Sequence, residues 1–99
     1  MPFVRVMPQQ VVHSDGYVVA SKDRYHMQYW DNAVRVVIGV DRGIDNIGVY
    51  KNSMKFYASS DVEMTAQVYC SENQHEEIFS RIINGLIALG YSRSHIEFL

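Results

Sequence analysis

The sequence predicts an α+β domain, in which a mostly antiparallel, meandering sheet of six to eight strands is covered by one C-terminal helix. The helix is expected at about residues 72–89, and a short final strand follows it. Before Ser71, apolar and polar residues alternate with the period of two that is typical of half-buried strands. From Glu72 to Leu89 apolar residues recur at helical spacing, and Gly90 ends that pattern. The length of 99 residues suits one domain, so residues 1–99 are expected to form a single unit.

Four strands are predicted in the first third of the chain. Phe3–Met7 is a short apolar run between two prolines, as expected of an edge strand. Gln10–Ser14 and Tyr17–Ser21 flank Asp15-Gly16, a dipeptide that favours a two-residue hairpin turn. After a reversal at residues 22–23, Arg24–Trp30 alternates again. Its odd-numbered side chains are expected to share one face: Tyr25, Met27 and Tyr29.

The middle of the chain predicts a central strand and further hairpins. Val34–Val40 alternates apolar residues with others and contains enough valine and isoleucine to suit a buried position. Asp41–Asn46 is rich in turn-forming residues and is expected to be a loop. Ile47–Tyr50 and Met54–Ala58 are expected to form a hairpin joined by residues 51–53, and Val62–Val68 is expected to be a further strand.

The predicted helix has a clear start and one broad apolar side. Ser71 and Gln74 have the spacing of a capping box, in which each side chain bonds to the other residue's backbone N–H. Gly85 lowers helix propensity and therefore predicts a close approach of the helix to the sheet. Residues 94–99 are expected to form the last strand, with Ile96 and Phe98 inward. The apolar stripe comprises Ile78, Phe79, Ile82, Ile83, Leu86 and Leu89.

Composition limits the classes of function. The formal net charge is −2, from 11 acidic and 9 basic side chains, so no overall field favours binding to nucleic acid or an anionic membrane. No apolar run approaches the roughly 20 residues that span a bilayer. The single cysteine, Cys70, cannot form an internal disulfide, and the N-terminus has no secretory signal pattern. We therefore expect a cytoplasmic protein without a membrane partner.

The residues that most often carry chemistry form no recognised motif. Four histidines are present, but none has a partner at metal-ligand spacing, and no glycine-rich phosphate loop opens a helix. We therefore expect no metal, no cofactor and no enzymatic activity. One alternative is a small ribonuclease or hydrolase that uses His13 or His26 with Lys55 as general acid and base. Cys70 precedes the helix start, where a thiol can become reactive, but a lone cysteine is more often a packing residue. The histidines are His13, His26, His75 and His95.

The predicted strands contain more aromatic residues than their core needs, which indicates exposed rings. With arginines and lysines between them, these rings would stack on the bases of a single-stranded nucleic acid. With nearby carboxylates they would instead anchor a protein partner, and the negative net charge favours this second reading. A third reading is that the tyrosines simply bury their rings and hydrate their hydroxyls. The residues are Tyr25, Tyr29, Trp30, Tyr50, Phe56, Tyr57 and Tyr69.

Four segments between residues 24 and 99 carry a family resemblance: RYHMQYWDNAVRV at 24–36, GVY at 48–50, SMKFY at 53–57 and IINGLIALGY at 82–91. In order and type they resemble a family of small bacterial immunity proteins. The family is encoded beside polymorphic or contact-dependent growth-inhibition toxins. The sequence departs from the family at 56–57, where Phe-Tyr replaces a tryptophan followed by proline, and in a longer approach to the helix at 65–74. The resemblance implies an inhibitor that binds a cognate toxin and blocks its active or substrate-binding surface without turnover.

The partner-binding residues are predicted from their chemistry and not from the resemblance. If the toxin is a nuclease, carboxylates would occupy the basic surface meant for phosphates, and exposed rings would anchor the contact. Nucleic acid is the less favoured partner, and an unprotected edge strand leaves open the pairing of two copies. The predicted partner-binding residues are Trp30, Asp41, Asp45, Tyr50, Tyr57, Asp61 and Glu63.

Overall fold

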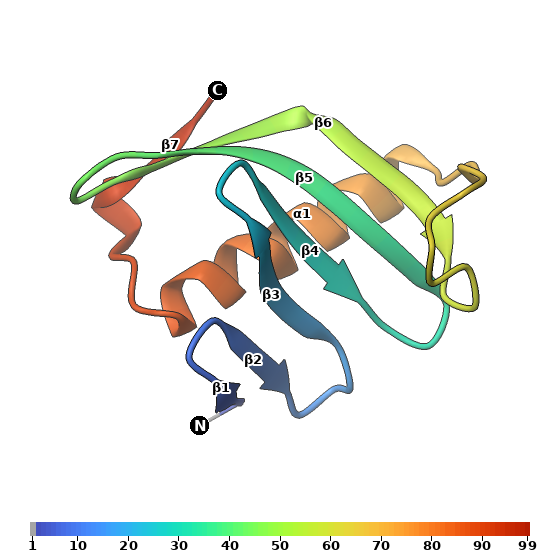
Figure 1. Cartoon of the computed structure of the whole chain (residues 1–99), viewed down its shortest axis with the longest axis horizontal. Helices are drawn as coiled ribbons and strands as arrows, with labels where there is room; N and C mark the ends of the chain where they lie inside the picture. The colour runs from blue at the N-terminus through green and yellow to red at the C-terminus, as the bar shows by residue number, and fades with distance from the viewer. Residues whose placement is uncertain (1) are drawn as a thin grey trace.

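The computed structural model describes residues 2–99, which form seven strands and one α-helix (Figure 1). A short 3-10 turn, Arg93–His95, precedes the last strand. The elements are β1 Phe3–Met7, β2 Gln10–His13, β3 Val18–Asp23, β4 His26–Trp30, β5 Val34–Arg42, β6 Ile47–Ala58, α1 Glu72–Ala88 and β7 Ile96–Phe98.

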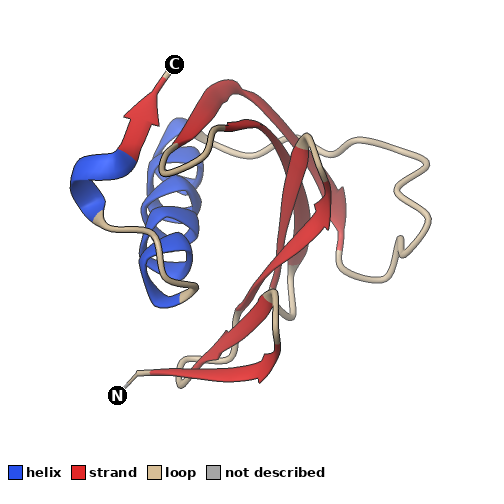
Figure 2. Cartoon of the chain, turned by 60° about the vertical axis from the view of Figure 1, so that its left-hand side comes forward, coloured by secondary structure: helices blue, strands red, loops and turns tan. Residues whose placement is uncertain are grey.

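The strands form one sheet in sequence order, from β1 to β7. Strands β1 to β6 pair antiparallel with their neighbours, and β7 pairs parallel to β6 after the chain has passed through α1. The sheet is curved, and α1 lies on its concave side (Figure 2). The predicted α+β meander with one covering helix and a short final strand is therefore confirmed.

The core lies between α1 and the concave face of the sheet. Ile78, Ile82, Ile83 and Leu86 of the predicted helical stripe are buried, whereas Phe79 and Leu89 are half-buried at its margin. The sheet contributes a larger set of buried residues. These are Val11, Val19, Met27, Tyr29, Val36, Ile38, Val40, Ile47, Val49, Phe56 and Ile96.

Two local features of α1 confirm the sequence prediction. The Ser71 hydroxyl accepts from the Gln74 N–H at 3.3 Å, and the Gln74 side chain accepts from the Ser71 N–H at 2.9 Å. Gly85 faces Val19 of β3 so closely that an added Cβ would lie 2.5 Å from the Val19 Cβ. The helix start and its approach to the sheet are thus both set by short segments of sequence.

The hairpin predicted at residues 47–58 is wrong, because these residues form the single strand β6. The register passes from Val37 opposite Lys55 to Gly39 opposite Tyr50, so β5 advances by two residues while β6 advances by five. Residues 51–54 therefore lie opposite Ile38 alone, three more than a regular ladder places there, and form a bulge. The polar segment interrupts the ladder without reversing the chain.

The strand predicted at Val62–Val68 is also wrong. This part of the chain is a connection of turns that pairs with the sheet through an isolated bridge between Tyr57 and Gln67 and forms no ladder with it. Val62 is 64% exposed and Val68 is 40% exposed. The alternating pattern is present, but it has no neighbouring strand along its length with which to form a ladder.

Several strand ends differ from the prediction. β5 continues to Arg42, so the loop expected from residue 41 begins at residue 43. β4 begins at His26, which leaves Tyr25 in the preceding turn and 60% exposed instead of on the face of Met27. The last strand has only three residues; Ile96 is buried as predicted, but Phe98 is 59% exposed.

Candidate functional site

The candidate site is the outer face of the sheet, meaning the face that α1 does not cover. Side chains alternate across a strand, so residues paired between neighbouring strands share a face. Trp30, Arg35 and Tyr57 are paired in this way across β4, β5 and β6. The Arg35 guanidinium lies 5.5 Å from the centre of the Trp30 ring, and its Nε donates to the Ser59 carbonyl at 2.9 Å. Two predicted partner-binding residues therefore flank one cation.

These two rings offer only limited contact area. Trp30 is half-buried, and Tyr57 is only 9% exposed, close to its bridge with Gln67. Two other rings that were candidates for exposure, Tyr29 and Phe56, lie in the core. The exposed aromatic surface therefore lies elsewhere on this face.

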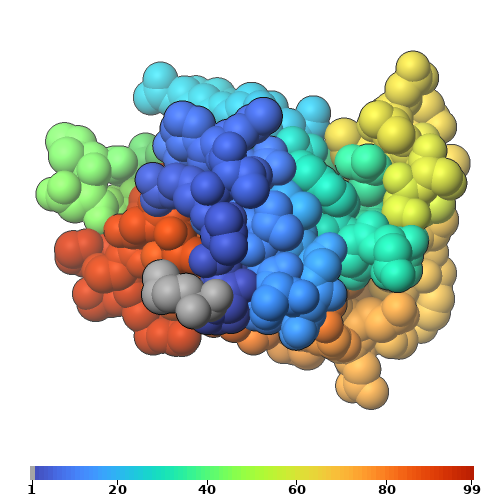
Figure 3. All heavy atoms as spheres, turned by 90° about the horizontal axis from the view of Figure 1, so that it is seen from below, coloured from blue at the N-terminus to red at the C-terminus, as the bar shows by residue number. Residues whose placement is uncertain are grey.

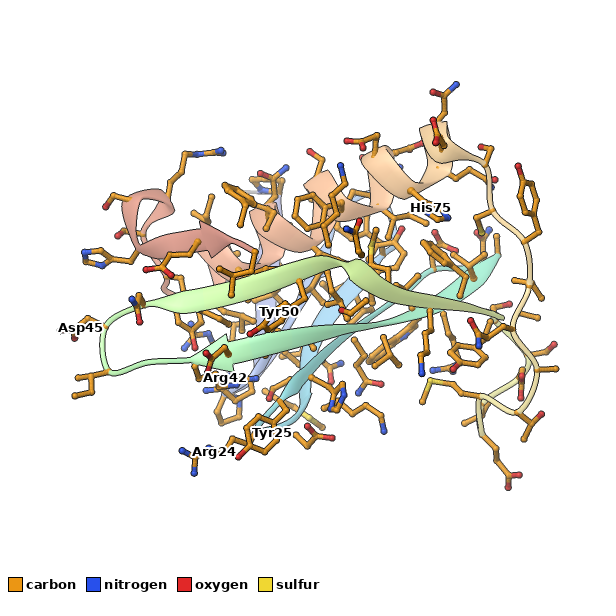
Figure 4. All side chains as sticks on the ribbon, turned by 90° about the horizontal axis from the view of Figure 1, so that it is seen from above. Arg24, Tyr25, Arg42, Asp45, Tyr50 and His75 are labelled. Atoms are coloured by element: carbon orange, nitrogen blue, oxygen red, sulfur yellow. The ribbon has the colours of Figure 1, made fainter. Side chains whose placement is uncertain are left out.

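A second group of rings lies near the β5–β6 hairpin. Tyr25, Asp41 and Tyr50 line a shallow hollow of about 400 Å³, here called the tyrosine hollow. The Tyr25 and Tyr50 side chains are 60% and 43% exposed, and Asp41 is exposed as well. In Figure 4 the two labelled tyrosines lie on either side of β5. The structure thus brings the predicted residues Asp41 and Tyr50 together with Tyr25, which was a candidate for an exposed ring but not a predicted partner-binding residue.

The β3–β4 turn explains why Tyr25 reaches this hollow. The Asp23 carboxylate accepts from the Tyr25 N–H at 2.9 Å and contacts His26 Nδ1 at 2.8 Å. These bonds, the His26 contact first, lower the pKa of Asp23 and keep it ionised. Arg42 Nε also donates to the Arg24 carbonyl at 3.1 Å and fixes the turn against β5. An aspartate at the first position of a turn is the signal that places Tyr25 outside the strand.

The remaining predicted carboxylates lie at opposite ends of the molecule. Asp45 is exposed at the tip of the β5–β6 hairpin, next to Ile44, whose side chain is fully exposed at 100% (Figure 4). Asp61 and Glu63 belong to the connection after β6. Figure 3 shows the hairpin tip and this connection, in green and yellow, protruding at the two ends. A partner that contacts only one end of the molecule would therefore not touch Asp45 together with Asp61 and Glu63.

The Asp61 carboxylate is engaged within its own loop. It accepts from the backbone N–H groups of Ala66 at 3.0 Å and Thr65 at 2.9 Å. These hydrogen bonds, that of Ala66 first, hold the pKa of Asp61 below its ordinary value. The loop also holds Met64 at a φ of 55°, in the left-handed region that non-glycine residues rarely adopt. Asp61 therefore stabilises a local conformation, whereas Glu63 is exposed.

Of the two histidines that were alternatives for a catalytic pair with Lys55, only His26 lies near Lys55. His26 and Lys55 line the same hollow on the outer face, together with Lys22. His13 lies elsewhere, stacked on Tyr17 with ring centres 4.5 Å apart, and lines a different hollow beside α1. The structure thus brings together His26 and Lys55 but not His13.

The two other histidines are also separate from this hollow. His75 stacks on Phe56 of the core with ring centres 4.3 Å apart. His95 lies near the hairpin tip, where it lines a hollow with Ile44 and Tyr91.

Cys70 is buried at 6% exposure, and burial, followed by the charge of Asp31, raises the pKa of its thiol. Within residues 2–99, no three His, Cys, Asp or Glu side chains form a group that could hold a metal ion. In the same part of the chain, no helix is both long and apolar enough to cross a membrane.

Comparison of the chain with protein-family models, with curated proteins and with solved structures finds no match.

Proposed function

We propose that this protein is an immunity protein that binds a cognate bacterial toxin and blocks its active or substrate-binding surface. The observation that carries the proposal is the tyrosine hollow, in which two exposed rings and one carboxylate lie together on the outer face. The resemblance between residues 24 and 99 and small immunity proteins supports the same class of partner.

The chemistry of the tyrosine hollow suits a protein partner. Tyrosine has a large apolar ring, few rotatable bonds and a hydroxyl that can donate, so it is enriched among residues that dominate binding energy. Asp41 beside the rings, and Asp45 at the hairpin tip, present negative charge to a basic surface. Such charges increase the rate of association with a cationic partner such as the substrate surface of a nuclease.

Co-expression with the product of a neighbouring toxin gene tests this function. The wild-type chain is expected to protect the cells and to co-purify with the toxin. Tyr50→Ala and Asp41→Lys are expected to weaken both protection and binding. Tyr69→Ala is the matched control, because Tyr69 is 91% exposed but lies in the connection before α1, outside the tyrosine hollow. A wild-type chain that neither binds nor protects would exclude the proposal.

Binding of single-stranded nucleic acid is the alternative, and it needs exposed ring faces beside cations. Tyr25 meets this need, since it is 60% exposed and the Arg24 guanidinium lies 5.8 Å from its ring centre. The rings beside Arg35 do not, because Trp30 is half-buried and Tyr57 is only 9% exposed. Oligonucleotide binding that falls steeply with salt and is lost in Trp30→Ala would instead support the alternative.

A further inference from the structure

A second hollow on the outer face is independent of the tyrosine hollow in its chemistry. It has a volume of about 320 Å³ and lies where the bulge of β6 faces β5. We call it the lysine hollow. Its lining includes Lys22, His26, Val37, Ser53, Lys55 and Met64.

The lysine hollow carries positive charge that the described residues do not neutralise. Lys22 and Lys55 are both exposed, and neither forms an ion pair within residues 2–99. No carboxylate belongs to the described lining. The neighbouring Asp23 is already bonded to His26 Nδ1 at 2.8 Å and to the Tyr25 N–H at 2.9 Å. The two ammonium groups are therefore available to an anion, and His26 keeps Nε2 free of the Asp23 contact.

The bulge explains why a hollow exists at this point of a regular sheet. Gly39 contributes no side chain, and Ser53 is drawn toward the backbone, since its Oγ accepts from the Gly39 N–H at 2.7 Å and donates to the Tyr50 carbonyl at 2.6 Å. A Cβ on Gly39 would lie 3.1 Å from that same Oγ. Gly39 and Ser53 thus leave open a space that longer, outward-pointing side chains at these positions would fill.

One wall of the lysine hollow is apolar, and it includes a residue with a strained backbone conformation. Met64 lines the hollow opposite the strands, and its φ of 55° is a strained conformation for a residue with a side chain. The hydrogen bonds from Thr65 and Ala66 to Asp61 hold the loop in that conformation. Val37 contributes an apolar surface from β5. The hollow therefore combines two ammonium groups with a small apolar slot.

We propose that the lysine hollow binds a small organic phosphate monoester. The dianionic phosphate would lie between the ammonium groups of Lys22 and Lys55, which offer six N–H donors and complementary charge. The apolar body of the ester would lie between Val37 and Met64, where thioether and ring contacts are favourable. This site does not depend on the proposed toxin binding, since it uses other side chains.

Titration of the ¹⁵N-labelled chain with phenyl phosphate, followed by amide chemical shifts at low ionic strength, tests the proposal. Inorganic phosphate and phenol are titrated separately, because they carry only the charged part or only the apolar part of the probe. Saturable shifts at Val37, Gly39, Ser53 and Lys55 are expected with phenyl phosphate. Weaker saturable shifts at the same amides are expected with inorganic phosphate, and none with phenol. No saturable shift with phenyl phosphate, or saturation at other amides only, overturns the proposal.

Lys55→Gln and Lys22→Gln are each expected to weaken phenyl phosphate binding about tenfold, because each removes one charge-assisted contact. Lys51→Gln is the matched control, since Lys51 lies in the same strand but pairs with Glu76 of α1. Equal weakening in Lys51→Gln would show general charge attraction and overturn the site.

A third variant tests the apolar wall. Met64→Gly removes the side chain, and glycine readily adopts the positive φ of this position, so we expect the loop to keep its conformation. It is expected to weaken phenyl phosphate binding while leaving the affinity for inorganic phosphate unchanged. An unchanged affinity for phenyl phosphate would exclude the proposed position of the ester's apolar body.

Discussion

Gly85 is the single residue on which the packing of α1 against β3 depends most directly. An added Cβ would lie 2.5 Å from both Cβ and Cγ2 of Val19, and real Cβ atoms do not approach so closely. Gly85→Ala gains roughly 1 kcal/mol of helix propensity but must displace the helix or Val19. Overpacking of this kind costs about 1–3 kcal/mol, so we expect net destabilisation in urea unfolding.

Asn84→Ala is the control for Gly85→Ala, because Asn84 is the preceding residue of α1 and is exposed. It improves helix propensity at an exposed position and is expected to stabilise the chain by a few tenths of a kcal/mol, on the order of the propensity difference. If Gly85→Ala were stabilising to the same degree, the close approach of the helix to Val19 would be wrong.

Residue-level predictions from sequence succeeded where the cause is local. The capping box of Ser71 and Gln74 depends on a spacing of three residues, and the glycine within an apolar helix indicated a close contact. Tyr25 was one of seven candidate exposed rings, but it was also placed in the strand on the face of Met27, because the sequence does not show where the β3–β4 turn ends. That end is fixed by Asp23 and by Arg42, which lies far away in the sequence.

Among the structural elements, the bulge of β6 depends on one hydroxyl. Ser53 Oγ accepts from the Gly39 N–H and donates to the Tyr50 carbonyl, so it replaces ladder bonds that the three extra residues remove. Ser53→Ala leaves both backbone groups without that partner. A part-buried backbone group without a partner costs about 1–3 kcal/mol, and we expect a loss of this order in urea unfolding.

Asn52→Ala provides the comparison for the bulge, since Asn52 belongs to the same bulge and is exposed. It is expected to change the free energy of unfolding by less than about 0.5 kcal/mol, as is usual for exposed positions. Similar stability of Ser53→Ala and wild type would contradict the structural role of the hydroxyl.

The β4–β5 turn predicts a pH dependence of stability to which Asp31 contributes. Burial favours the neutral acid, but the Tyr29 hydroxyl at 2.7 Å and the N–H groups of Val34 at 2.8 Å and Ala33 at 2.7 Å outweigh it. The pKa of Asp31 is therefore below its ordinary value of 3.8. A pKa lowered by folding gives stability that is present above the unfolded-state pKa and is lost as the pH falls through the folded-state pKa.

Asp31→Asn tests this dependence. The variant is expected to be less stable than wild type near neutral pH, and the difference is expected to shrink as the pH falls from about 5 to below 3. The measurement is the free energy of unfolding in urea across that pH range. Asp23 and Asp61 also have lowered pKa values and are present in both chains, so the difference between the chains reports Asp31. A constant difference at every pH would exclude this role.

The two wrong strand predictions share a physical reason: each depended on how strands pair, which the local sequence pattern does not show. Residues 51–53 carry turn-forming side chains, which indicate an interruption of the ladder but do not distinguish a bulge from a reversal. Residues 62–68 alternate as a strand does, but a strand also needs an open neighbour. On the edge of β6 that faces away from β5, residues 47–49 pair with β7, and Tyr57 forms an isolated bridge with Gln67 of the connection.

Considered as a whole, the molecule separates a predictable inner face from an outer face that the sequence does not resolve. The core follows from apolar periodicity, which is why its helix and strands were expected. The positions of Asp41 and Tyr50 in one hollow, and of Asp45 and Asp61 at opposite ends, depend instead on strand order and curvature. Strand order and curvature are set by pairing between distant segments. Residue type alone therefore identified candidate residues but did not show which of them share one surface.

The shared core predicts that α1 and the sheet unfold together. Leu86 is fully buried between them, and truncation of such a side chain costs about 2–5 kcal/mol. The near-ultraviolet signal arises from seven tyrosines and one tryptophan, none of which lies in α1, and Tyr17 and Tyr29 are part of the core cluster. This signal therefore reports the sheet side of the core, while the far-ultraviolet signal includes the helix. In Leu86→Ala both signals are expected to shift to the same lower midpoint, as a two-state transition requires. Ser80→Ala, at an exposed position of α1, is expected to leave both midpoints unchanged. Loss of the helical signal before the tyrosine signal would show that α1 docks on a sheet that folds without it.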